Sequence, residues 1–142
     1  RAEAASQRAD AEAQRAEAAS QRAEAATLRA ERLAALLRAH GHETEAVRDA
    51  REAIDRATSF APNLIVMDIQ MPHITGLELI EMIRRDVVLR RIPIMAVTAY
   101  ASKADEDRIR EAGADAYVSK PITLFRFMEA IGELSALADA RA

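Results

Sequence analysis

A short apolar run that ends in a carboxylate constrains the fold of this chain more than any other stretch. Residues 64–67 read Leu-Ile-Val-Met, Asp68 follows them, and Pro72 prevents the segment from continuing as a helix. Because the run is short, β-branched and not alternating, it predicts a strand buried on both faces, as in a parallel sheet. Asp68 then lies at the carboxyl end of that strand, where open α/β sheets bind their ligands.

The chain beyond Gly41 alternates between helical and strand patterns. Apolar residues at helical spacing predict four helices, over residues 49–60, 77–85, 103–112 and 124–137. Two further buried runs predict strands over residues 93–99 and 116–121, and a short polar segment, 43–47, is predicted as an edge strand. Strands that alternate with helices of this length imply crossover connections and therefore a parallel sheet.

The first 40 residues follow a different pattern, a repeat of seven residues rich in Ala, Glu, Gln and Arg. Neither Gly nor Pro occurs before Gly41, so the segment predicts one helix over residues 1–39, about 58 Å long at 1.5 Å per residue. Alanine occupies most seam positions of the heptad. Two interpretations stay open: an Ala-lined coiled coil that forms a homodimer through residues 1–40, or a solvated single helix that acts as a spacer.

Length and charge limit the classes of protein to consider. The chain has 142 residues, enough for one domain with an appendage, which we divide into a heptad helix over residues 1–28 and a globular domain over 29–142. A formal net charge of -3 argues against nucleic-acid binding. No apolar run is long enough for a membrane helix, and the absence of cysteine suits a cytoplasmic protein.

Three polar side chains follow the three predicted buried strands. Asp68, Thr98 and Lys120 each stand where a strand ends. Because the carboxyl ends of parallel strands meet at one edge of a sheet, we expect a carboxylate, a hydroxyl and an ammonium group to converge there. Each residue alone is unremarkable, but three in register predict a binding or reaction site.

Three segments around these residues resemble the signature segments of bacterial response-regulator receiver domains. They are Met67-Asp68-Ile69-Gln70-Met71-Pro72 with Gly76, then Ala96-Val97-Thr98-Ala99, and Tyr117-Val118-Ser119-Lys120-Pro121. The resemblance covers residues 41–137. This part of the chain is similar in particular to single-domain receivers of the DivK type. It implies a flavodoxin-like α/β fold and a phosphoprotein of two-component signal transduction, not an enzyme with a substrate of its own.

The resemblance also implies a role for each site residue. Asp68 would accept a phosphoryl group from a histidine kinase or a histidine phosphotransfer protein, as in a phosphorelay, while Thr98 and Lys120 would contact the phosphoryl oxygens. Mg²⁺ would be held by Asp68 and the backbone carbonyl of Gln70. Tyr117 would be the aromatic residue of the Thr98 switch, although a ring packed against the last helices fits the sequence equally well. The Lys120-Pro121 bond would be cis, and the face that carries Arg108, Ile109, Tyr117 and Phe125 would dock a partner.

The chain departs from the family at its first strand. Receivers begin with an apolar central strand that ends in two acidic residues, which hold Mg²⁺. Counting back from Gly41 places that strand on residues 18–23 and the acidic pair on Glu24 and Ala25. The sequence Ala-Ala-Ser-Gln-Arg-Ala favours helix and cannot form a buried strand. We therefore expect the first strand to be missing, Mg²⁺ binding to be weakened, and a swapped or partner segment to cover the gap.

Two functions from different classes remain. The first is a phosphoacceptor receiver in which Asp68 switches partner binding. The second is a pseudo-receiver, an interaction or scaffold module that is oligomerised by the N-terminal helix. Retention of Asp68, Thr98 and Lys120 favours the first, and loss of the acidic pair favours the second.

Overall fold

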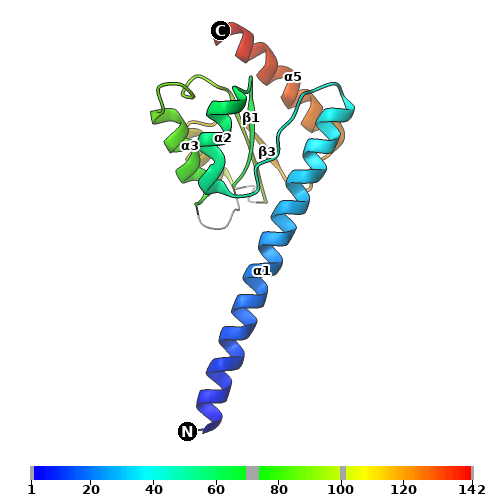
Figure 1. Cartoon of the computed structure of the whole chain (residues 1–142). Helices are drawn as coiled ribbons and strands as arrows, with labels where there is room; N and C mark the ends of the chain where they lie inside the picture. Colours follow the sequence, from blue (N-terminus) through cyan, green and yellow to red (C-terminus); the bar gives the residue numbers. More distant parts are fainter. Residues whose placement is uncertain (1, 70–73, 100–101, 142) are drawn as a thin grey trace. The chain divides into compact units, whose positions relative to one another are not determined.

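The computed structural model describes residues 2–69, 74–99 and 102–141, apart from the side chains of residues 22, 23 and 25–29. The chain divides into two compact units, residues 1–48 and residues 49–142. The first unit consists of a long helix and an irregular segment, and the second is an α/β unit (Figure 1). The proposed boundary after residue 28 is not tested by this division and stays a prediction.

The sheet of the second unit has three parallel strands within the described residues. They are β1 (Ile65–Asp68), β2 (Ile94–Thr98) and β3 (Ala116–Ser119), in the order β1-β2-β3. Ile65 pairs with Ile94 in the first ladder, and Thr98 pairs with Ser119 in the second. All five residues of β2 are buried, as expected for a central parallel strand covered on both faces. The three predicted strands and their parallel arrangement are confirmed. Burial throughout is confirmed for β2 alone: β1 and β3 stand at the edges of the described sheet, and in each only one residue of four, Met67 or Val118, is buried.

Helices connect the strands and carry the core. They are η1 (Ala50–Glu52), α2 (Ala53–Phe60), α3 (Gly76–Arg85), α4 (Lys103–Ala112) and α5 (Leu124–Arg141). Residues of α2, α3 and α4 form one apolar cluster with Ile94 and Ala96 of β2. Met95 and Val97 point to the opposite face because side chains alternate along a strand, and α5 packs against β2 and β3. The buried residues of α5 are Phe127, Ile131 and Leu134.

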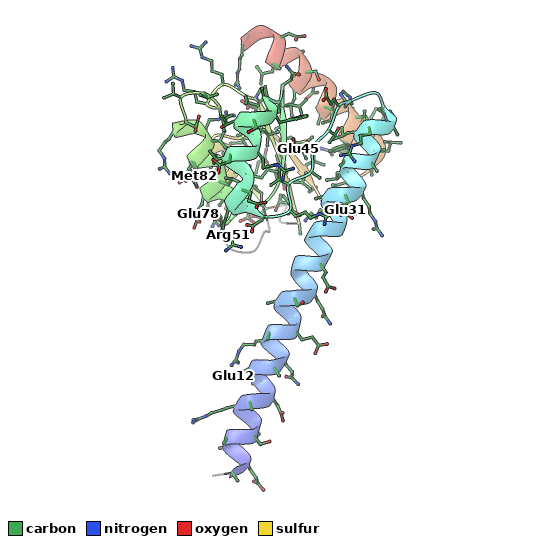
Figure 2. All side chains as sticks on the ribbon, viewed as in Figure 1. Glu12, Glu31, Glu45, Arg51, Glu78 and Met82 are labelled. Atoms are coloured by element: carbon green, nitrogen blue, oxygen red, sulfur yellow. The ribbon has the colours of Figure 1, made fainter. Side chains whose placement is uncertain are left out.

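The first unit contains α1 (Ala2–Ala39), which is about 57 Å long at 1.5 Å per residue. Most of its side chains between residues 2 and 21 are exposed, and Glu12 projects away from the helix axis (Figure 2). Gly41 ends the helix at a φ of 87°, with the amide of His42 donating to the carbonyl of Leu37 at 3.0 Å. This is the usual glycine-terminated geometry of a helix C-terminus. The long N-terminal helix is thus confirmed.

One predicted element is wrong. Residues 43–47 form no strand and run as irregular chain in the first unit. The carbonyl of Thr44, which a neighbouring strand would have to bind, instead accepts hydrogen bonds from the Arg38 guanidinium at 2.7 and 3.3 Å. The Thr44 hydroxyl donates to the carbonyl of His42 at 3.1 Å. Local side chains therefore satisfy backbone groups that an edge strand would have paired.

Two predicted helices also have different bounds in the structure. The helix predicted over residues 49–60 begins as a 3₁₀ turn, η1, which Asp49 caps through the amide of Arg51. The last helix continues to Arg141 rather than ending at 137. Residues 18–23, where a receiver would place its first strand, lie within α1.

Candidate functional site

Asp68 and Lys120 form the centre of the candidate site. Asp68 is the last residue of β1, and Lys120 directly follows β3, so the parallel sheet brings residues 52 positions apart to one edge. The Lys120 Nζ atom lies 3.1 Å from Asp68 Oδ1 and 3.1 Å from Asp68 Oδ2. Both side chains are about one-fifth exposed, at 18% for Lys120 and 19% for Asp68. The pair is thus reachable from solvent yet shielded enough for its charges to interact strongly.

Thr98 stands at the carboxyl end of the strand between these two residues. It is the last residue of β2 and is completely buried. Its carbonyl accepts a hydrogen bond of 2.7 Å from the amide of Lys120, and the amide of Ile69 donates to the carbonyl of Val97 at 3.0 Å. These backbone bonds continue the ladders just past the strands. They hold the three site residues at the same edge.

Gly76 packs closely against the backbone of Asp68 and Ile69. The amide of Gly76 donates to the carbonyl of Ile69 at 3.1 Å, and Thr75 caps α3 by accepting from the amide of Glu78. A Cβ atom at position 76 would lie 2.5 Å from the Cα of Ile69 and 3.0 Å from the carbonyl oxygen of Asp68. The sequence indicated Gly76 only as part of a signature segment, and this close approach was not predicted from it.

Tyr117 and the residues after β3 complete the predicted set. Tyr117 lies in β3, is partly buried and packs against the apolar cluster of α2, α3 and α4. The Lys120-Pro121 peptide bond is cis, as the resemblance implied. Gln70 lies outside the described residues, so its predicted metal-binding carbonyl cannot be placed.

The predicted docking face is partly wrong. Ile109 is 2% exposed and belongs to the core, because it lies on the inner side of α4. Phe125, by contrast, is 76% exposed at the start of α5, beside Leu124 at 53%. The exposed parts of that face are therefore Arg108 on α4 and Phe125, with Leu124, at the start of α5.

The donor groups for a metal ion are few. Among the described residues, no group of three or more His, Cys, Asp or Glu side chains could hold a metal. Asp68 supplies one carboxylate, and that carboxylate is paired with Lys120. These residues do not fit a Mg²⁺ site built from protein carboxylates alone.

A second charged cluster, which sequence reasoning missed, lies at the amino ends of the strands. Asp115 immediately precedes β3 and accepts hydrogen bonds from the amide of Ile94 at 3.0 Å and from Arg84 Nη2 at 2.8 Å. Arg141 Nη2 donates to the other carboxylate oxygen at 2.6 Å. Burial lowers the pKa of Arg84; the adjacent Asp115 opposes this shift, and the positive charge of Arg141 adds to it. No sequence motif links these residues.

Comparison with known proteins relates most of the chain to one family. A family model described as the response regulator receiver domain matches residues 23–132. A polar-differentiation response regulator DivK from Brucella anthropi is 50% identical over 96 residues, which cover 68% of this chain and 78% of the relative. Within the described residues, no helix is both long and apolar enough to cross a membrane.

Solved structures show the same fold. The receiver domain of a signal transduction histidine kinase from Syntrophus aciditrophicus has a TM-score of 0.69 and 31% identity, covering 77% of this chain and 83% of its own. The chemotaxis response regulator CheY4 of Vibrio cholerae has a TM-score of 0.69 at 24% identity, covering 74% and 88%. The second likeness concerns the fold alone.

Proposed function

Because the chain belongs to the response regulator receiver domain family, a class of signalling domains and not of enzymes, we propose that Asp68 is its phosphoacceptor. Receiver domains interact with histidine kinases or histidine phosphotransfer proteins, so the donor is a phosphohistidine. The observation that carries the proposal is the contact of Lys120 Nζ with both Asp68 carboxylate oxygens, each at 3.1 Å.

The chemistry needs little beyond positioning and charge. An Asp68 oxygen attacks the phosphorus, an O–P bond forms as the N–P bond of the donor breaks, and the departing imidazole takes a proton from solvent. The Lys120 ammonium faces the oxygens on which negative charge accumulates. Thr98, at the end of β2, would give a hydroxyl hydrogen bond to a phosphoryl oxygen.

Mg²⁺ binding is weakened in this chain. Receiver domains generally bind Mg²⁺ in an acidic pocket, whereas the described residues here contain no group of three or more His, Cys, Asp or Glu side chains that could hold a metal. The residues that would carry the missing pair, Glu24 and Ala25, lie in α1. A Mg²⁺ ion would then be held by one carboxylate together with phosphate and water, which is a weaker arrangement than a full set of carboxylates.

A pseudo-receiver function is the second candidate, and the absence of the acidic pair favours it. Residues 18–23 form part of α1, so they do not supply the central strand that precedes the acidic pair in receivers. A chain that has lost this strand could keep its fold as an interaction module without accepting phosphate. In that case self-association through residues 1–40, or a swapped segment at the sheet, would be its main activity.

The output of the switch is a change in partner binding. Leu124 and Phe125 present exposed apolar surface at the start of α5, only a few residues after Lys120. A phosphoryl group that draws in Thr98 and Lys120 would alter this segment, with Tyr117 filling the space that Thr98 leaves. We place this function in the bacterial cytoplasm. The partners are a histidine kinase or histidine phosphotransfer protein, which donates the phosphoryl group, and a second copy of the chain, which binds through α1.

Incubation with Mg²⁺ and acetyl phosphate, followed by intact-mass measurement, separates the two candidates. The phosphoacceptor function predicts a mass gain of one phosphoryl group in the full chain and none in Asp68→Ala. Asp115→Ala is the matched control, because it removes another partly buried aspartate that pairs with basic side chains. A folded chain that gains no mass at saturating acetyl phosphate and Mg²⁺ would contradict the phosphoacceptor function and leave the scaffold.

A further inference from the structure

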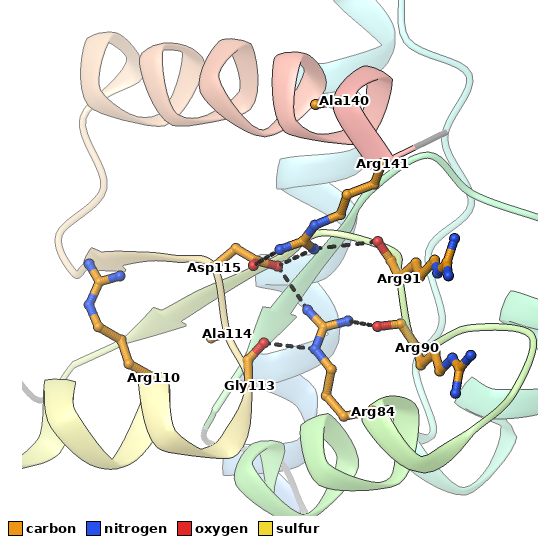
Figure 3. A pocket seen from close by; sticks show the side chains of 9 residues that line it. All are labelled: Arg84, Arg90, Arg91, Arg110, Gly113, Ala114, Asp115, Ala140 and Arg141. Carbon is orange, nitrogen blue, oxygen red and sulfur yellow. Dashed lines mark hydrogen bonds and ion pairs between the residues drawn. The ribbon is translucent and has the colours of Figure 1, made fainter.

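An arginine-lined pocket of about 760 Å³ lies at the amino ends of the strands. Figure 3 shows it between the end of α3, the turn after α4 and the end of α5. Its charged lining residues are Arg84, Arg90, Arg91, Arg110, Asp115 and Arg141. Five arginines against one aspartate leave a formal charge of +4, and Glu106 beside Arg110 reduces the local charge by one.

Two of the arginines build the floor of the pocket. Arg84 donates from Nε to the carbonyl of Gly113 and from Nη1 to the carbonyls of Arg90 and Ile92, each at 2.8 Å. Arg84 and Arg141 share the Asp115 carboxylate. These bonds join α3, α5 and the segment before β2 at one point, so the floor is rigid.

The segment 86–92 presents the remaining charges from a fixed position. Leu89 is 1% exposed and anchors the segment in the core, while the carboxylate of Asp86 accepts from the amides of Val88 and Leu89 at 2.9 and 3.1 Å. Arg90 and Arg91 are both exposed, and neither has an ion pair among the described side chains. In Figure 3 both side chains extend from this segment, on the side of the pocket opposite Arg110.

We propose that this pocket binds a compact anion carrying two or more phosphoryl groups. Guanidinium groups bind phosphate oxygens through paired N–H donors, and the backbone that carries Arg90 and Arg91 is already held in place by Leu89 and Asp86. A pocket of this volume accepts a small molecule. The lining contains no aromatic side chain, so the phosphoryl chain is the recognised part and a nucleobase is not required.

The pocket is separate from the phosphoacceptor site. Asp115 and Ile94 stand at the amino ends of β3 and β2, and Asp68, Thr98 and Lys120 stand at the carboxyl ends. Four residue steps of β2 separate the two ends by about 13 Å at 3.3 Å per residue. A ligand here therefore cannot be the phosphoryl group of Asp68, and the proposal does not rest on the phosphoacceptor function.

Isothermal titration calorimetry on the full chain tests this inference. The probes are inorganic tripolyphosphate, ATP and adenosine in metal-free buffer, with anionic phospholipid vesicles as a separate arm. The test variant is Arg90→Ala/Arg91→Ala, which keeps the backbone carbonyls that Arg84 and Arg141 bind. The matched control is Arg51→Ala/Arg126→Ala, which removes the same charge from two exposed positions; Arg126 is about 22 Å along α5 from Arg141. Thermal unfolding checks that both variants are folded.

Tripolyphosphate is expected to bind the full chain. In Arg90→Ala/Arg91→Ala, the affinity for tripolyphosphate is expected to fall by about tenfold or more. The control should change binding by about twofold or less at 0.1 M ionic strength, where charges beyond roughly 10 Å are screened. Equal binding of ATP and tripolyphosphate assigns an inorganic ligand, and tighter binding of ATP assigns a nucleotide. Binding of adenosine or vesicles without tripolyphosphate, no binding at all, or equal weakening by both variants would overturn the proposal.

Discussion

Replacing Lys120 by alanine isolates the contribution of the ammonium group that touches Asp68. The Nζ atom is 3.1 Å from both carboxylate oxygens, and the pair is about one-fifth exposed. Two unit charges about 4 Å apart interact by roughly 4 kcal/mol at an effective dielectric constant near 20. Each 1.36 kcal/mol is a factor of ten in rate, so after discounting for solvent access we expect phosphorylation to slow by about 10²–10³-fold.

The assay is the initial rate of phosphoryl incorporation from acetyl phosphate, followed by intact mass. The control is Lys103→Ala, because Lys103 is exposed at the start of α4 and makes no contact with Asp68. Loss of a partly exposed ion pair should change the free energy of unfolding by only about 1–2 kcal/mol, so the variant stays folded. A Lys120→Ala rate within about threefold of the parent chain would refute the assignment of Lys120 to the phosphoryl oxygens.

Further predictions concern packing, stability and assembly. Gly76→Ala should destabilise the chain by about 1–3 kcal/mol in urea unfolding and also slow phosphorylation, because the new Cβ would press on the backbone of Asp68 and Ile69. The control Gly132→Ala has open space around the new Cβ and should be neutral or stabilising. Equal effects of the two glycine variants would argue against the close approach. Phe127→Ala should cost about 3–5 kcal/mol, since Phe127 is completely buried, and a loss below about 1 kcal/mol would contradict its place in the core. Deletion of residues 1–28 should convert a dimer to a monomer in sedimentation equilibrium, and an unchanged mass would favour the spacer interpretation of the heptad segment.

The elements that could be predicted from the sequence are those whose signal lies in neighbouring residues. The run Leu-Ile-Val-Met before Asp68 and the run Ile-Met-Ala-Val before Thr98 predict strands, and their parallel order follows from the helices between them. The meeting of Asp68 with Lys120 follows in turn, because parallel strands end at one edge. The segment 43–47 was predicted wrongly because its β-prone residues say nothing of Arg38, which binds the Thr44 carbonyl from α1.

The arginine cluster could not be predicted for a related reason. Arg84 and Asp115 are 31 residues apart, and each resembles an ordinary surface charge at a helix end or a turn. Their pairing depends on the turn after α4 approaching the end of α3, which no local pattern records. Ile109 shows the same limit, because an amphipathic helix predicts a buried face without specifying which neighbour covers it.

Locating the phosphoryl group within the chain tests the central claim most directly. Treatment of the phosphorylated chain with borohydride reduces an aspartyl phosphate to homoserine, and peptide mass mapping then identifies the modified position. We predict homoserine at residue 68 alone, dependent on prior incubation with the phosphodonor. Homoserine at another aspartate, or an unmodified Asp68 in a chain that has gained a phosphoryl group, would contradict the assignment.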